Sequence, residues 1–196
     1  MLSTRNTRRP GGGTAGRFVL LLLTAVLVQP LLCPAAVEAA SAAEIRRDAS
    51  AALKKLYAGT PKAKELADKA KGILVFPSIV KAGFLVGGLF GDGVLFKGGK
   101  AVAYYNTIAA SYGLQAGAQT YGYAMFFMND AALQYLDRSD GWELGTGPSV
   151  VVVDQGMAGG LSTSTARDDV YAFIFSQKGL MAGLGLQGSK ITKIQK

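Results

Sequence analysis

Hydrophobic residues recur at helical spacing over residues 42–59, which predicts an amphipathic helix. They share one face of a 3.6-residue period, and they are Ile45, Ala49, Ala52, Leu53 and Leu56. Thr60-Pro61 has the form of an N-cap followed by proline at the first helical position. We therefore expect a second helix over residues 62–71, with Gly72 as its C-cap.

From Ile73 the pattern changes to apolar or alternating runs rich in Val, Phe, Tyr and Ile, which predicts six to nine strands. Five glycines lie between Gly83 and Gly93. Glycine weakens regular structure unless backbones bend or approach closely, so we expect a strongly curved antiparallel sheet or barrel. Turns are expected at residues 97–99 and 177–179, and Pro77 indicates an edge or a bulge.

One stretch interrupts the strands, at residues 129–138, and it predicts a short inserted helix with Asn129 or Asp130 as its N-cap. The fold class is therefore α+β. A helical front segment, residues 40–72, precedes a β-rich body, residues 73–196. Together they contain about 155 residues, the size of a single domain.

The first 39 residues have the order of a cleaved signal peptide. Residues 1–17 carry four arginines and no acid, residues 18–28 are apolar or small, and small residues follow Pro30. The alternative is an uncleaved membrane anchor, but eleven helical residues rise only about 16 Å against roughly 30 Å of hydrocarbon. Cys33, the single cysteine, follows Leu31-Leu32, which disfavours lipidation. We expect a mature start near Ala40 or Ala43 and an exported protein, periplasmic or secreted.

Positive charge is concentrated in the front segment. From Ala40 onward there are 17 Lys and Arg against 12 Asp and Glu, and residues 46–71 hold eight of those bases and three of the acids. This asymmetry indicates an anionic partner. The candidate lipid-binding residues are Arg46, Arg47, Lys54, Lys55, Lys62 and Lys64.

Two interpretations of this basic segment remain open. In one, the amphipathic helix contacts a membrane surface; in the other, its apolar face packs on the sheet and only its charges face solvent. Nucleic acid is a poorer partner, because Tyr57 is the only aromatic residue among the basic ones.

The residue types give little support to an enzyme. Histidine is absent from the whole chain, which removes His-based triads and histidine metal ligation. Asp92, Asp154, Asp168 and Asp169 remain as carboxylates, and turn chemistry explains Asp92 and the Asp168-Asp169 pair more simply than catalysis does. The GxGxxG match at residues 183–188 lacks a following helix and acid. We expect no catalytic site, metal or cofactor.

Several glycine-containing motifs occur in the order typical of one family. They are Lys71-Gly-Ile-Leu-Val-Phe-Pro77, Lys81-Ala-Gly-Phe-Leu-Val-Gly-Gly88, Gly91-Asp-Gly-Val94, Tyr112-Gly-Leu-Gln-Ala-Gly-Ala-Gln119, Gly147-Pro148 and Ser176-Gln-Lys-Gly-Leu-Met-Ala-Gly183. On these motifs, the chain from about Ala43 to Lys196 resembles the SYLF domain, in the form found in bacterial exported proteins. It departs from the family at Ala103-Tyr-Tyr-Asn106, where Trp-Ser before a proline is common.

The resemblance implies a non-enzymatic protein that binds anionic lipid or phosphoinositide-like head groups through a basic amphipathic N-terminal segment. The six candidate residues come from the charge pattern and not from the family. The alternative function is a structural or protein-interaction module of the cell envelope, with a protein partner there. The lipid-binding function predicts salt-dependent binding to liposomes, whereas the alternative function predicts none.

Overall fold

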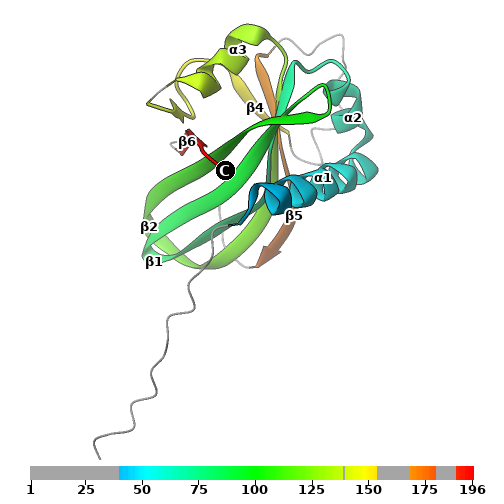
Figure 1. The fold of residues 1–196 in the computed structure, drawn as a ribbon. Coiled ribbons are helices and arrows are strands. Elements are labelled where there is room, and N and C mark those ends of the chain that lie inside the picture. The colour runs from blue at the N-terminus through cyan, green and yellow to red at the C-terminus, as the bar shows by residue number, and fades with distance from the viewer. Residues whose placement is uncertain (1–39, 139, 154–167, 180–188) are drawn as a thin grey trace, which may run out of the picture. The chain divides into compact units, whose positions relative to one another are not determined.

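The structure is a computed structural model that describes residues 40–138, 140–153, 168–179 and 189–196, without the side chains of residues 85 and 111–116. Figure 1 shows two helices lying beside a strongly curved sheet. This arrangement confirms the predicted fold class, α+β with N-terminal helices and a short inserted helix. The predicted signal peptide lies outside the described residues.

Helix α1 spans Ala42–Gly59, the same residues that the hydrophobic period predicts. It begins with a capping box, in which Ser41 accepts a bond from the backbone N–H of Glu44 and the Glu44 carboxylate accepts one from the Ser41 N–H. Helix α2 spans Pro61–Ala67 and starts with the expected proline. The predicted C-cap at Gly72 is wrong, because the helix ends at Ala67 and Gly72 already begins a strand.

Two long antiparallel strands form the centre of the molecule. Strand β1 spans Gly72–Lys97 and β2 spans Lys100–Phe127. The predicted turn joins them through Gly98 and Gly99, whose φ angles of 54° and 76° suit a two-residue hairpin turn. A shift in pairing between Phe76 and Ile79 confirms the bulge expected at Pro77.

The β1–β2 ribbon folds back on itself near Gly83, and the glycines permit this. A Cβ on Gly83 would lie 2.3 Å from the Gly87 Cα. A Cβ on Gly91 would lie 2.8 Å from Ile79, and one on Gly93 would lie 2.6 Å from Phe76. The two halves of β1 therefore approach closely, which confirms that glycine serves curvature and close packing here.

The remaining elements lie along β2 and beyond it. Helix α3 (Asp130–Gln134) has Asn129 as its N-cap, as predicted, and a 3-10 turn, η1 (Tyr135–Asp137), extends it. The strands are β3 (Trp142–Glu143), β4 (Val150–Val153), β5 (Val170–Gly179) and β6 (Lys190–Ile194). The turn predicted at residues 177–179 is wrong, because these residues continue β5.

The described strands form one six-stranded sheet in the order β3-β6-β2-β5-β4, with β1 paired to β2. Strand β2 is long enough to pair with β6 along residues 104–108 and with β5 along residues 119–127. All pairs are antiparallel except β4 with β5.

Each face of the curved sheet carries a hydrophobic core. One core holds Trp142 together with Phe76, Tyr105 and Tyr123. The other lies under the helices, where Ile45, Ala49, Leu56, Ala63 and Leu66 meet Val75, Val94, Phe126 and Phe173. Both cores are built only from residues 45–191, and residues 39–196 form one compact unit. The segment 40–196 thus contains all the residues of both hydrophobic cores.

Candidate functional site

The six predicted cations lie on the outer surfaces of α1 and α2. Arg46, Arg47, Lys54 and Lys55 occupy the solvent-facing half of α1, opposite the buried Ile45, Ala49 and Leu56. Lys62 and Lys64 project from α2, where Lys62 is partly covered. The four cations of α1 form two sequence-adjacent pairs, Arg46-Arg47 and Lys54-Lys55. These lie about two helical turns apart, so the positive charge is spread along α1.

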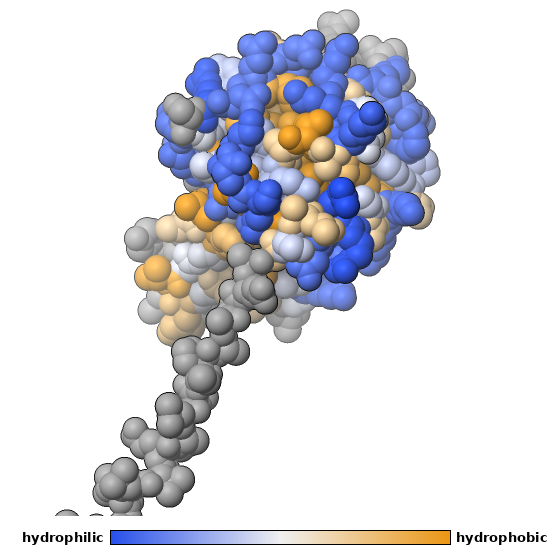
Figure 2. Space-filling model, in the orientation of Figure 1, coloured by the Kyte–Doolittle hydropathy of each residue, from blue (hydrophilic) through white to orange (hydrophobic). Residues whose placement is uncertain are grey.

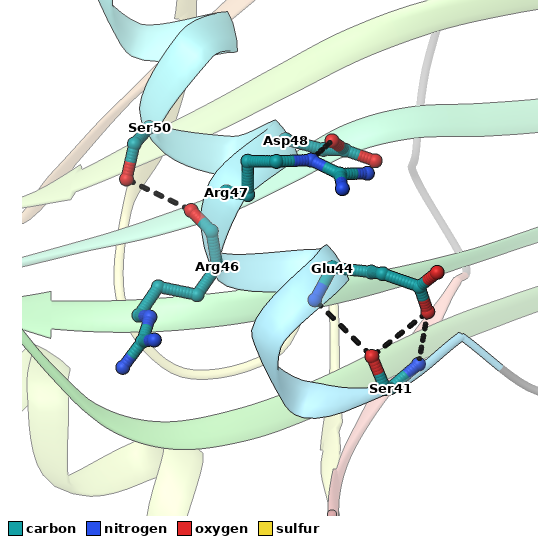
Figure 3. A network of polar contacts seen from close by, with 6 residues as sticks. All are labelled: Ser41, Glu44, Arg46, Arg47, Asp48 and Ser50. Atoms are coloured by element: carbon teal, nitrogen blue, oxygen red, sulfur yellow. Dashed lines mark hydrogen bonds and ion pairs between the residues drawn. The ribbon is translucent and has the colours of Figure 1, made fainter.

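Three of the six cations form ion pairs within the helical segment. The Arg47 Nε lies 2.9 Å from an Asp48 carboxylate oxygen, and the Lys62 Nζ lies 2.9 Å from a Glu65 oxygen. Lys64 pairs with Asp68 one turn along α2. Figure 3 shows the Arg47–Asp48 pair at the start of α1. These pairs neutralise all three acids of the basic segment.

The other three cations are Arg46, Lys54 and Lys55. Each is exposed, and within the part of the chain that the structure describes none forms an ion pair. In Figure 3 the Arg46 guanidinium extends away from the acids, while its backbone carbonyl accepts a bond from the Ser50 hydroxyl. The unpaired members of the six candidates therefore all lie on α1, while Lys69 and Lys71, which follow α2, are exposed and also form no ion pair among the described residues.

Lys54 lines a cleft of about 400 Å³ between the helices and the β1–β2 turn. Gly98 and Gly99 form the opposite wall, and the exposed Lys97 and Lys100 directly flank these glycines. Tyr57 also lines the cleft, and burial, with a smaller contribution from Asp68, raises the pKa of its hydroxyl to about 12. Tyr57 is therefore a neutral hydrogen-bond donor at physiological pH, and it lines the cleft together with Lys54 and with Asp68, which Lys64 neutralises.

Lys55 lines a second cleft, of about 280 Å³, on the other side of α1. Lys178 of β5 lies on its opposite wall, beside the Phe175 ring. Gly122 leaves the space for that ring, because a Cβ there would lie 2.5 Å from it. The fold thus brings two lysines that are distant in the sequence to one cleft.

Charge counting along the sequence missed Lys97, Lys100 and Lys178. Lys97 and Lys100 flank the turn that the sequence predicts correctly, so their exposure could have been foreseen. That the glycines between them line the same cleft as Lys54 depends on how α1 packs on the sheet, and no local pattern shows it.

The three candidate carboxylates that the structure describes have structural roles. The turn predicted at Asp92 is wrong, because Asp92 lies inside β1 and forms a 3.0 Å ion pair with Lys196. Asp168 accepts a bond from the Tyr171 hydroxyl, and Asp169 accepts bonds from Asn129 and Ser149. Asp154 and the 183–188 motif lie outside the described residues. Over the described ranges, no group of three metal-ligating side chains occurs.

Across the same ranges, no helix combines the length and the apolar character needed to span a bilayer. The comparison with curated proteins found no match for this chain. A family model, described as "Ysc84: Las17-binding protein actin regulator", matches residues 108–196, from the second half of the β1–β2 ribbon to the last residue. The match confirms the resemblance drawn from the glycine motifs: residues 108–196 are similar to the Ysc84, or SYLF, family.

Proposed function

We propose that this domain binds membrane surfaces rich in anionic, phosphoinositide-like head groups and has no catalytic role. The observation that carries the proposal is the set of exposed, unpaired cations on the outer face of α1, namely Arg46, Lys54 and Lys55. Basic residues close to an anionic bilayer each contribute about 1 kcal/mol to binding. The similarity of residues 108–196 to the Ysc84, or SYLF, family supports the same class of ligand.

The packing of α1 determines how this contact is made. Its apolar face is part of a core, where Ala49 is fully buried and Ile45 and Leu56 are almost so. Insertion of this face into lipid would expose the sheet beneath it. The helix therefore contributes charge at the membrane surface rather than an inserted apolar face.

The two clefts beside α1 are suited to individual phosphates. Lys54 lines one, where Asp68 is already paired with Lys64 and where Lys97 and Lys100 flank the lining glycines in sequence; Lys55 and Lys178 line the other. Ammonium groups on opposite sides of a cleft can donate hydrogen bonds to the same phosphate. The ion-paired cations contribute less to phosphate binding in this proposal, because acids of this chain already neutralise them. They are Arg47, Lys62 and Lys64.

A matched pair of triple variants of residues 40–196 tests the proposal. Arg46→Gln/Lys54→Gln/Lys55→Gln removes the unpaired cations, whereas Arg47→Gln/Lys62→Gln/Lys64→Gln removes the same formal charge from ion-paired positions. Co-sedimentation with equimolar phosphatidylglycerol and phosphatidylcholine vesicles should weaken by about a hundredfold for the first variant, and much less for the second. Binding of the unmodified domain should also fall as salt rises.

Two results would contradict the proposal. Equal binding of the unmodified domain to anionic vesicles and to pure phosphatidylcholine vesicles would exclude an electrostatic contact. Equal loss of binding in the two triple variants would mean that net charge acts without a defined site on α1.

A second candidate function is a structural or protein-interaction module of the cell envelope. It is favoured by the description of the matching family, which names binding to a protein and regulation of actin. This function requires no vesicle binding, and cross-linking followed by capture should then recover a specific envelope protein.

We also propose that the protein is exported, to the periplasm or the medium, with the domain associated with a membrane. The basic and apolar order of residues 1–39 supports this. The mass of the mature N-terminus tests it, because cleavage gives a chain that begins near Ala40 or Ala43. An intact N-terminus in the cellular protein would contradict cleavage.

A further inference from the structure

Exposed apolar side chains gather where the β1–β2 ribbon folds back. Among the described residues, seven large hydrophobic side chains are exposed, and five of them lie at this bend. Phe84 is the most exposed, at 74%. We call this group the apolar tip, and it consists of Val80, Phe84, Val86, Phe90 and Ile108. In Figure 2 it belongs to the orange and tan region at the lower left, where Figure 1 shows the bend.

The apolar tip continues the face of the sheet that α1 covers. Paired residues of neighbouring strands lie on the same face, and Phe90 pairs with Ile108. Four residues further along β1, Val94 lies on this face and packs in the core beneath the helices. The helices end before the bend is reached, so the apolar face extends beyond its cover.

Among the described residues, most of the charges around the apolar tip are positive. Residues 79–91 contain Lys81 and no acid, and residues 107–127 contain no charged residue. Lys178 and Lys190 lie at its border, paired with Thr120 and Ile108 on β2. The acids next to this region are Asp92, which Lys196 neutralises, and Glu143, which lies opposite Lys190 where β3 pairs with β6. Over the described residues, lysines make up most of the charge that borders this apolar surface, which complements an anionic bilayer and disfavours a second copy with the same lysines.

We propose that the apolar tip inserts into the interface of an anionic bilayer while the cations of α1 remain at its surface. This inference rests on the proposed function and names the part of the domain that enters the lipid. Since the apolar face of α1 is buried in a core, the tip supplies the apolar contact that the helix cannot. The lysine stems can extend along the acyl boundary and keep their ammonium groups among the head groups.

A tryptophan reporter tests the insertion directly. Trp142 is buried and gives a constant background, so Phe84→Trp reports the environment of the tip and Val152→Trp, an exposed site on β4, is the matched control. With residues 40–196 and equimolar phosphatidylglycerol and phosphatidylcholine vesicles, the emission of Phe84→Trp should shift to shorter wavelength. Brominated lipids should quench it, and the control should show neither effect.

A second pair of variants measures the contribution of the tip to affinity. Phe84→Ser/Phe90→Ser should weaken vesicle binding by at least about tenfold, and Val152→Ser by less than about twofold. Circular dichroism should show unchanged folding, because these side chains are exposed. The salt dependence of the residual binding should persist, since the cations of α1 are intact.

The outcomes separate this inference from the proposed function. Salt-dependent vesicle binding without an emission shift, or without loss in the double serine variant, would overturn insertion and leave the proposed function standing. An emission shift with neutral vesicles and no salt dependence would support insertion and reject electrostatic binding. No vesicle binding at all would reject both.

Discussion

Single glycines of β1 differ in what they do. Gly91 and Gly93 lie where the two halves of the strand meet. A Cβ on Gly91 would lie 3.2 Å from the Ser78 carbonyl oxygen, and a Cβ on Gly93 would lie 2.7 Å from the Val75 carbonyl oxygen. Gly88 lies between them and the bend, yet a Cβ there would meet only the Ala109 carbonyl oxygen, at 3.7 Å. The sequence presents these glycines as one repeated feature, whereas the structure needs only some of them for close packing.

Alanine at Gly93 should destabilise the domain, and alanine at Gly88 should not. A Cβ on Gly93 would lie 2.7 Å from the Val75 carbonyl oxygen and 2.6 Å from the Phe76 ring. Overpacking of this kind costs about 1–3 kcal/mol. Gly88→Ala meets ordinary contacts, so its effect on the free energy of unfolding should be near zero or slightly stabilising. Urea unfolding of both variants measures the difference, and equal losses would show that the close approach is unimportant.

At the scale of elements, α1 packs on the sheet with one half of its surface and exposes charge with the other. Its apolar stripe holds it on the sheet, and its outer half presents the cations to solvent. The sequence left open whether the apolar face meets membrane or sheet, and the structure places it on the sheet. Charges on a fixed helix are held in a defined arrangement, which favours recognition of a surface without a change of fold.

The elements that could be predicted are those with a local cause. The period of α1, the Gly98-Gly99 turn, the bulge at Pro77 and the N-cap at Asn129 each depend on neighbouring residues. The errors have tertiary causes. Residues 68–71 fit a helix, but their chain leads into β1, where the Lys71 N–H donates to the Phe127 carbonyl oxygen. Residues 177–179 resemble a turn, but pairing with β2 extends β5 through them.

At the scale of the whole molecule, the folded ribbon determines where the candidate surfaces lie. The six cations could be named from the sequence because they lie within 19 consecutive residues of the front segment. Lys178 and the apolar tip could not, because their positions depend on long-range pairing. The same pairing places Lys178 across a cleft from Lys55 and leaves Phe84 at the uncovered bend. The two proposed membrane contacts therefore arise from one topology.

Asp169 joins three segments that are distant in the sequence. Its carboxylate accepts bonds from the Ser149 backbone N–H at 2.9 Å, next to β4, and from the Asn129 side-chain amide at 2.8 Å, at the N-cap of α3. Asp169 itself precedes β5. The Ser149 bond, followed by the Asn129 bond, lowers the pKa of this carboxyl below its ordinary value of 3.8.

This depressed pKa predicts a particular dependence of stability on pH. A carboxyl whose pKa is lower in the folded chain stabilises the fold fully above the unfolded value, and the contribution disappears as pH falls through the folded value. Asp169→Asn should therefore lower the free energy of unfolding by at most about 1 kcal/mol at neutral pH, because solvent screens this carboxylate, and the difference from the unmodified domain should shrink in acid, below about pH 4. Thermal unfolding across this range measures it. The exposed Asp140→Asn is the control, with little change at any pH. A loss for Asp169→Asn that stayed constant from neutral to acid pH would show that the amide disturbs packing and that the charge contributes nothing.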